Sequence, residues 1–309
     1  MRRALMVPIL SAALAAAAPT PQMIQTADGP RTYLLLRPGA PGPRPLVILL
    51  HGHGGSAHQA LTTGPLAAWK AISAREGVIV AALDGAKGGD GRQGWNDGRS
   101  DAAGNPKVDD VAFVKAVIQR LERESGADPH RVYLMGMSNG AMMTLRLALQ
   151  LDPAPAAFCA VCGLMASEGP CAGTAPRPVP ALLIDGTADP LVPFEGGQVH
   201  FFKQQRGGVI SAQATVDHWL QADGLAGAPA RTTVFPHQPA SGDTRAVKTV
   251  WGTAPGPQVE FIRVEGGGHA EPTLAFAYGP LYRAFTGKQN RDFESAEEAW
   301  AFFKDQRSR

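Results

Sequence analysis

The chain has 309 residues, 44% hydrophobic and 18% charged, a length that suits one large or two small globular domains. Its 29 basic and 27 acidic residues give a formal net charge of +2, and this near balance argues against a nucleic-acid-binding protein. The 36 glycines and 26 prolines indicate long ordered loops, three cysteines are too few for a disulfide scaffold, and collagen, coiled coils and multi-span membrane proteins do not fit this composition.

Residues 1–18 have the pattern of a secretory signal peptide. Arg2 and Arg3 precede an apolar run that ends in small residues, and the polar stretch PTPQ follows. The run is shorter than the ~20 residues that a membrane span needs, and no later segment is apolar for long enough. We therefore expect cleavage near Ala17 or Ala18, and a secreted or periplasmic protein without a membrane span.

Short apolar runs then alternate with helix-like segments, as in a parallel sheet covered by helices on both faces. Asp109 can cap a helix that Gly126 can end. Residues 139–151 are apolar on nearly all sides and predict a buried helix, while Ser295 and Glu298 form a capping box for a C-terminal helix. The expected strands are Tyr33–Leu36, Pro45–Leu50, Val78–Leu83, Val132–Gly136, Ala157–Cys162, Ala181–Asp185 and Val259–Val264.

The chain after the signal peptide contains no internal repeat and no linker-like boundary. We therefore expect residues 19–309 to form a single α/β domain, with a loop-rich insertion at 193–258. Because export permits disulfides, Cys162 and Cys171 are the pair that we would test for one.

A serine flanked by glycines lies in Gly136-Met137-Ser138-Asn139-Gly140, between an apolar strand and an apolar helix. At a strand-to-helix turn, G-x-S-x-G is typical of a nucleophile elbow. The dipole of the following helix favours negative charge that develops on the Ser138 hydroxyl. The alternative is a plain helix start with Ser138 as the N-cap, but the two glycines and the strand favour a nucleophile.

A nucleophilic serine needs a base and an acid, which follow it in the order Asp or Glu, then His, in this arrangement. His269 follows a strand-like run and the glycines of Glu-Gly-Gly-Gly, so we expect it to be the base. Asp189, on the turn after an expected strand, is the expected acid, with Asp185 as a structural neighbour. The remaining histidines after the elbow are His200, His218 and His237.

An oxyanion in the transition state needs two N–H donors. The elbow supplies one, the backbone amide of Asn139. The glycine-rich loop His51-Gly52-His53-Gly54-Gly55 follows an early strand and lets the backbone approach a substrate closely. We assign the second donor to the amide of His53, with that of Gly54 as an alternative.

Two other chemistries fit the same loop less well. His51 and His53 could form an H-x-H metal pair, but no clear set of further ligands follows. The loop glycines with Ala57 match a loose dinucleotide-binding pattern, yet Asp84 lies farther along than the ~20 residues expected. An exported protein also has little access to NAD. We therefore expect no metal and no cofactor.

With these residues assembled, the chain resembles the polyhydroxybutyrate depolymerase and feruloyl esterase branch of the α/β hydrolases over most of residues 19–309. The resemblance implies an α/β-hydrolase fold, with a mostly parallel central sheet and helices on both faces, and ester hydrolysis without a cofactor. Ser138, Asp189 and His269 fall on the family's triad positions, and Trp95 falls in a loop that lines the family's substrate groove. The similar segments are LLHGHGG, GWNDGR, VDDVAFV, DPHRVYLMGMSNGAMMT, DGTADPLVPFEGG, VEGGGH and AEEAWAFF.

Several nearby residues also have structural interpretations. Trp95 can pack under its own loop as readily as it can contact a substrate, and Asp97 can pair with Arg99 to hold that loop. Asp109 and Asp110 can cap a helix and brace a loop.

The expected function is that of an exported serine esterase that forms an acyl-enzyme. Its partners would be small or polymeric esters, namely hydroxyalkanoate oligomers, feruloyl or acetyl groups on polysaccharides, or short acyl esters. Ala270-Glu271-Pro272 stand where family members often carry Trp-Pro-Gly, and this departure bears on the polymer substrate. The alternatives are a serine peptidase of the same fold and, after it, a non-catalytic binding protein or an NAD-dependent oxidoreductase.

Overall fold

The computed structural model describes residues 18–39, 42–171, 177–201 and 204–308. The expected signal peptide lies outside these residues except for Ala18. The main sheet consists of β1 (Thr20–Thr26), β2 (Gly29–Leu36), β3 (Arg44–Leu50), β4 (Ile79–Leu83), β7 (Ala127–Met137), β8 (Ala157–Val161), β9 (Ala181–Gly186), β12 (Ala230–Val234), β13 (Arg245–Gly252) and β14 (Gln258–Glu265).

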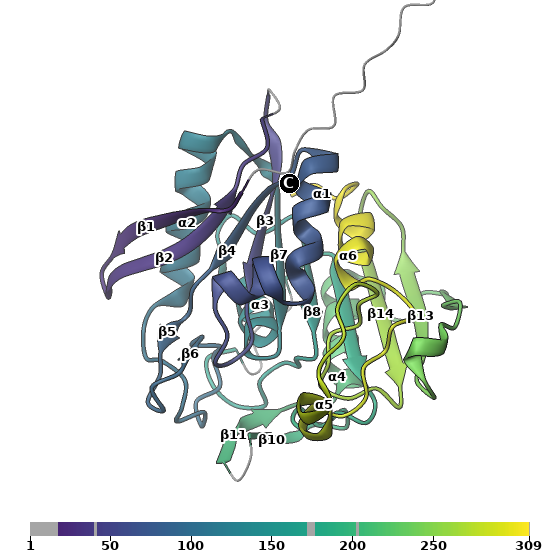
Figure 1. Cartoon of the computed structure of the whole chain (residues 1–309). Coiled ribbons are helices and arrows are strands. Elements are labelled where there is room, and N and C mark those ends of the chain that lie inside the picture. The colour runs from purple at the N-terminus through teal and green to yellow at the C-terminus, as the bar shows by residue number, and fades with distance from the viewer. Residues whose placement is uncertain (1–17, 40–41, 172–176, 202–203, 309) are drawn as a thin grey trace, which may run out of the picture.

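The ten strands of this sheet lie in the order β1-β2-β4-β3-β7-β8-β9-β14-β13-β12 (Figure 1). The six central strands, from β4 to β14 in that order, run parallel to one another. At each end of the sheet the last two strands are joined by antiparallel pairing, β2 with β4 and β1 with β2 at one end, and β13 with β14 and β12 with β13 at the other. The seven strands that the apolar runs predict are all present, six of them in the parallel centre. Strands β4 and β8 are buried at every residue, as expected where helices cover both faces.

Helices cover both faces of the sheet, and the predicted fold class is confirmed (Figure 1). One face packs against α2 (Asp110–Ser125), α3 (Asn139–Gln150) and α4 (Ala212–Ala222). The other face packs against α1 (Trp69–Glu76) and α6 (Ser295–Phe303), where the rings of Tyr133 and Phe303 stack with centroids 4.9 Å apart. The short helix α5 (Pro280–Thr286) lies at the lower edge of the view.

The ends of α2 are fixed by local capping residues, whereas the start of α6 is fixed by a contact with a distant residue. Asp109 caps α2 by accepting a hydrogen bond from the Ala112 amide at 2.9 Å, and Gly126 ends it with φ 70°, both as predicted. The capping box predicted for α6 is wrong, because Glu294 is its N-cap residue. The Ser295 hydroxyl instead donates to buried Glu271, 2.7 Å away.

The segment from 193 to 258 is richer in secondary structure than expected. It contains β10 (Gly197–Phe201), β11 (Gln204–Val209) and the short helix η3 (Pro239–Ser241), besides α4, β12 and β13. The expectation of a loop-rich insertion is therefore wrong, because two of these strands extend the main sheet. The remaining elements are η1 (Gln59–Thr63), η2 (Pro65–Ala68), β5 (Ala86–Lys87) and β6 (Gln93–Gly94).

Two further sequence expectations concern cysteines and membranes. The disulfide suggested for Cys162 and Cys171 is wrong, since Cys159, Cys162 and Cys171 are all free and buried. Cys171 lies beside Gln150, whose amide approaches its sulfur at 3.5 Å. Within the described ranges, no helix combines the length and hydropathy that a membrane span requires.

Candidate active site

Ser138 lies at the turn between β7 and α3, where its φ of 56° is unusual for a residue other than glycine. A Cβ atom at Gly136 would lie 2.2 Å from the Gly140 carbonyl oxygen, and one at Gly140 would lie 2.2 Å from the Leu50 oxygen. Only glycine fits at either position, and the two glycines allow the tight turn. The turn places Ser138 directly after β7, at the carboxyl edge of the sheet. This is the strand-turn-helix geometry that the sequence pattern predicts.

His269 and Asp189 lie beside this serine. His269 Nε2 is 2.8 Å from Ser138 Oγ, and its Nδ1 is 2.7 Å from Asp189 Oδ2. Because a carboxylate only accepts, the proton is assigned to Nδ1, and Nε2 accepts from the serine hydroxyl. The other Asp189 oxygen accepts from the amides of Leu191 and Val192, both at 2.8 Å, and these bonds orient the carboxylate.

The competing acid and histidines lie in other surroundings. Asp185 accepts from the Gly163 amide at 3.1 Å, and burial raises the pKa of its carboxyl well above the usual range. His218 is in α4 beside Trp219, and His237 is 3.2 Å from Asp292. His200 lies on β10, exposed. The structure therefore brings together Ser138, Asp189 and His269, and none of the alternatives.

The two expected oxyanion donors come from two separate segments, the turn before α3 that carries Ser138 and the loop after β3. The Asn139 side chain is held by Trp95 and Asp97: its Oδ1 accepts from the Trp95 amide at 2.7 Å, and its Nδ2 donates to Asp97 at 2.6 Å. The Gly54 amide donates to the Gln93 carbonyl at 2.7 Å, so the Gly54 alternative does not fit. The backbone amides of Asn139 and His53 have no acceptor among the described residues.

Trp95 has a packing role in this structure. Its side chain is completely buried, its indole N–H donates to the His51 carbonyl at 2.8 Å, and its ring centroid is 5.2 Å from that of His51. The substrate contact expected for Trp95 is therefore wrong, and the packing alternative fits. Asp97 and Arg99 pair at 2.6 Å as expected, and Asp110 braces the loop by accepting from the Asn96 amide at 2.8 Å.

The imidazoles of His51 and His53 are both engaged by protein groups. His51 Nδ1 donates to the Gly52 carbonyl at 2.7 Å and its Nε2 accepts from the Gly85 amide at 2.9 Å. His53 Nε2 is 2.8 Å from Asp90, and its Nδ1 is 3.3 Å from Arg206. These contacts leave no free ring nitrogen for the H-x-H metal pair.

One group in the described part of the chain has the composition of a metal site, Cys162 with Asp189 and His269, whose ligand atoms lie within 4.8 Å of one another. Burial raises the pKa of the Cys162 thiol well above its usual range, which disfavours the thiolate that binds metals. Asp189 and His269 are hydrogen-bonded to each other. The group is better suited to proton transfer than to metal binding.

Sequence reasoning missed Asp90 and Arg206, which contact the imidazole of His53. They are 116 positions apart and belong to no recognisable motif, so only the fold brings them together. The sequence indicates Cys162 only as a candidate disulfide partner, although its thiol lies beside Asp189 and His269.

Comparison with known proteins identifies the family. Residues 31–182 match the family described as Esterase PHB depolymerase. NocK of Nocardia uniformis subsp. tsuyamanensis, whose name assigns it to the esterases, is 33% identical over 96% of this chain and 85% of its own length. The chain belongs to this esterase family. It is therefore a carboxylic ester hydrolase.

Other known proteins match this ester hydrolase either in sequence over part of their length or in fold. Feruloyl esterase B of Piromyces equi is 31% identical, and the match covers 74% of this chain but 40% of that relative. A thermostable esterase superposes with a TM-score of 0.56 at 15% identity, covering 94% of this chain and 63% of the other. An acetyl xylan esterase from Aspergillus awamori has a TM-score of 0.53 at 16% identity, covering 81% and 94%. At these identities the solved structures show the fold alone.

Proposed function

We propose that this ester hydrolase is a serine esterase that acts through an acyl-enzyme on the Ser138 hydroxyl. The observation that carries the proposal is the unbroken line of hydrogen bonds from Asp189 through His269 to Ser138, with lengths of 2.7 and 2.8 Å. Such a line is the arrangement by which a base activates a nucleophile and a carboxylate orients the base.

In the proposed mechanism, Ser138 Oγ attacks the ester carbonyl carbon while His269 Nε2 takes the hydroxyl proton. Asp189 keeps the Nδ1 proton in place and stabilises the imidazolium that forms. The amides of Asn139 and His53 donate to the oxyanion. His269 then gives this proton to the leaving alcohol, takes a second proton from the water that attacks the acyl-enzyme, and passes that second proton to the Ser138 oxygen as the carboxylic acid leaves.

We further propose export, and a substrate among hydroxyalkanoate oligomers, feruloyl or acetyl esters of polysaccharides, and short acyl esters. Residues 1–18 support export by their signal-peptide pattern. The names of two relatives, feruloyl esterase B and a bifunctional acetylxylan esterase/xylanase of Neocallimastix patriciarum, support the polysaccharide esters. The chain spans 40% and 20% of these two proteins. A panel of p-nitrophenyl acyl esters, methyl ferulate and polyhydroxybutyrate would separate the candidates.

Ser138→Ala tests the mechanism. We expect the variant to fold and to lose p-nitrophenyl ester hydrolysis by ~10⁵-fold or more in kcat, because alanine lacks the hydroxyl on which the proposed acyl intermediate forms. Labelling by a fluorophosphonate probe should disappear as well. The matched control is Ser73→Ala, since that buried hydroxyl donates to the Val78 carbonyl near the far end of the sheet. Retained turnover or labelling in Ser138→Ala would contradict the proposal, and inhibition of the wild type by EDTA would point to a metal.

A further inference from the structure

A charged cluster surrounds the imidazole of His53, whose amide is a proposed oxyanion donor. His53 Nε2 is 2.8 Å from Asp90 Oδ2, and the same oxygen is 2.9 Å from the Arg206 guanidinium. A second guanidinium nitrogen lies 3.3 Å from His53 Nδ1. Because a guanidinium can only donate, Nδ1 is the acceptor and Nε2 carries the proton that Asp90 accepts. The three side chains form a closed ring of hydrogen bonds.

The hydrogen-bonded ring is largely buried, and its members have defined charges at neutral pH. The side chains of His53, Asp90 and Arg206 are 8%, 18% and 6% exposed. Burial alone would raise the pKa of Asp90, but hydrogen bonds from Arg206, the Arg92 amide and His53 lower it to about 2, so the carboxylate is charged at neutral pH. Burial and the Arg206 charge lower the pKa of His53, which keeps its imidazole neutral.

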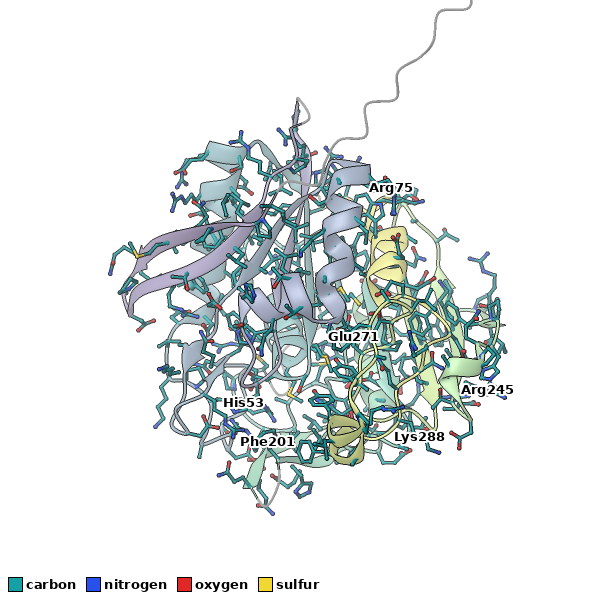
Figure 2. The ribbon with its side chains drawn as sticks, in the orientation of Figure 1. His53, Arg75, Phe201, Arg245, Glu271 and Lys288 are labelled. Carbon is teal, nitrogen blue, oxygen red and sulfur yellow. The ribbon has the colours of Figure 1, made fainter. Side chains whose placement is uncertain are left out.

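The ring connects loops that are distant in sequence. Asp90 lies between β5 and β6, His53 follows β3, and Arg206 lies on β11. Phe201, on β10 of the same hairpin, packs edge-on against the His53 ring with centroids 5.7 Å apart, and Figure 2 shows the two side by side. The His53 side chain is therefore held by two hairpins that lie outside the main sheet.

The same network reaches the other proposed oxyanion donor. The Arg206 carbonyl accepts a hydrogen bond from the Arg99 guanidinium, which pairs with Asp97 at 2.6 Å. The same Asp97 oxygen accepts from Asn139 Nδ2 at 2.6 Å. One chain of buried contacts thus joins the residue after Ser138 to the loop that carries His53. The network therefore fixes the side chains of both residues whose backbone amides are the proposed donors, Asn139 and His53.

We propose that Asp90 and Arg206 are positioning residues for the oxyanion hole, which hold the His53 backbone amide in place through its imidazole. This inference rests on the proposed function, since it requires an oxyanion at Ser138. A preorganised donor stabilises the transition state without reorganisation during the reaction. A donor whose loop moves by a fraction of an ångström loses part of that effect. The Michaelis complex depends less on it, because the oxyanion has not yet formed.

Asp90→Asn is the primary test. Asp90 Oδ1 accepts a hydrogen bond from the Arg92 amide at 3.1 Å, and Oδ2 accepts from His53 and Arg206. An asparagine has only one acceptor oxygen and therefore loses one of these two sets of hydrogen bonds. We expect kcat for p-nitrophenyl butyrate to fall by ~10- to 100-fold, less than the ~100- to 1000-fold for removal of a whole donor. KM should stay within about twofold, because ground-state binding is unchanged.

Asp128→Asn is the matched control. Asp128 is 19% exposed, accepts from the amide two residues on, His130, at 3.0 Å, and pairs with Arg131 at 2.6 Å. It thus repeats two of the contacts of Asp90, those with an amide two residues on and with an arginine, at the start of β7 and at the opposite end of the strand from Ser138. Loss of local hydrogen bonds should lower the unfolding temperature of both variants by similar amounts, whereas only Asp90→Asn should also lower kcat.

A thionoester supplies a readout that loss of stability would not change. Its sulfur accepts hydrogen bonds more weakly than oxygen, so an intact oxyanion hole favours the oxygen ester. We expect the ratio of kcat/KM for the oxygen ester to that for the thionoester to shrink in Asp90→Asn and to stay at the wild-type value in Asp128→Asn.

Arg206→Met is the second variant, for use even if Asp90→Asn does not fold. It removes the guanidinium but keeps the backbone carbonyl that accepts from Arg99. We expect the same fall in kcat and the same smaller ester ratio, with Arg206→Lys recovering part of both. Wild-type kcat and ester ratio in folded Asp90→Asn or Arg206→Met would overturn the inference while leaving the serine mechanism intact. Activity retained in Ser138→Ala would instead contradict both proposals.

Discussion

Three buried acidic residues have incompletely hydrogen-bonded carboxyl groups. Asp185, Glu271 and Glu294 each have one carboxyl oxygen without a partner among the described residues. Burial raises the pKa of all three, that of Glu271 to about 8. Glu271 lies two residues after His269, and its carboxyl group accepts one hydrogen bond, from the Ser295 hydroxyl. Figure 2 shows it near the centre of the molecule. An uncharged carboxyl is therefore its more stable form below about pH 8.

Glu271→Gln should change how stability depends on pH. The carboxyl has a pKa of 4.5 when unfolded and about 8 when folded, so the folded protein holds a proton that the unfolded chain loses within this window. The wild type should lose up to ~1.4 kcal/mol of unfolding free energy per pH unit there, relative to the variant. Above about pH 8 the difference should level off. Urea unfolding from pH 5 to pH 9 measures it, and a constant difference would contradict the predicted titration.

The turn from β7 to α3 is the element on which the candidate site depends. Its backbone passes so close to β3 that the atoms around Gly140 leave no room for a methyl group, with the Leu50 oxygen 2.2 Å from the Cβ position. The same crowding affects Gly163 after β8, whose Cβ position is 2.6 Å from the Ala141 Cβ and 2.8 Å from the Ser138 oxygen. Tight packing of three consecutive parallel strands fixes the position of the serine.

Gly140→Ala should therefore disrupt the turn. The added methyl group must displace backbone of β3 rather than a flexible side chain, so we expect a loss of unfolding free energy of ~3 kcal/mol and a large loss of esterase activity. Gly39→Ala is the control, because nothing lies within 4 Å of its Cβ position. Thermal unfolding and p-nitrophenyl ester assays measure both effects. Wild-type stability in Gly140→Ala would refute the close approach.

At the scale of the whole molecule, the formal charge of +2 belongs to the expected signal peptide. Arg2 and Arg3 are the only charged residues in positions 1–18, so the rest of the chain has equal numbers of acidic and basic residues. Among the described residues the first strand is β1, which starts at Thr20, and Thr20 pairs with Leu35 of β2. Removal of residues 1–18 therefore takes away no strand or helix of the described structure.

Cleavage can be measured directly on the exported protein. We expect an intact mass that lacks residues 1–17 or 1–18 when the protein is recovered from the periplasm or the medium. A chain that begins at Pro19 should unfold at the temperature of the full-length chain, since β1 is complete in both. Recovery from the cytoplasm alone, with Arg2 and Arg3 retained, would contradict export.

Local signals account for much of this fold. The parallel strands are apolar runs because both faces are covered, and the apolar pattern shows them without knowledge of their neighbours. Strands β12 and β13 have no such signal: β12 is exposed at every residue, and β13 is mostly half-buried. The pairing of β12 with β13 and of β13 with β14 is a tertiary event. The capping box expected from Ser295 and Glu298 is wrong for the same reason, since the Ser295 hydroxyl bonds to Glu271 rather than to its own helix.

Short patterns along the chain are enough to predict the family segments, the elbow around Ser138 and the order of serine, acid and histidine. Only the fold shows that Asp189 rather than Asp185 meets His269, that Trp95 is buried, and that Cys162 is unpaired. It also brought Arg206 to Asp90. Contacts between distant segments depend on how strands and loops pack in three dimensions, and no spacing in the chain encodes that packing in a readable form.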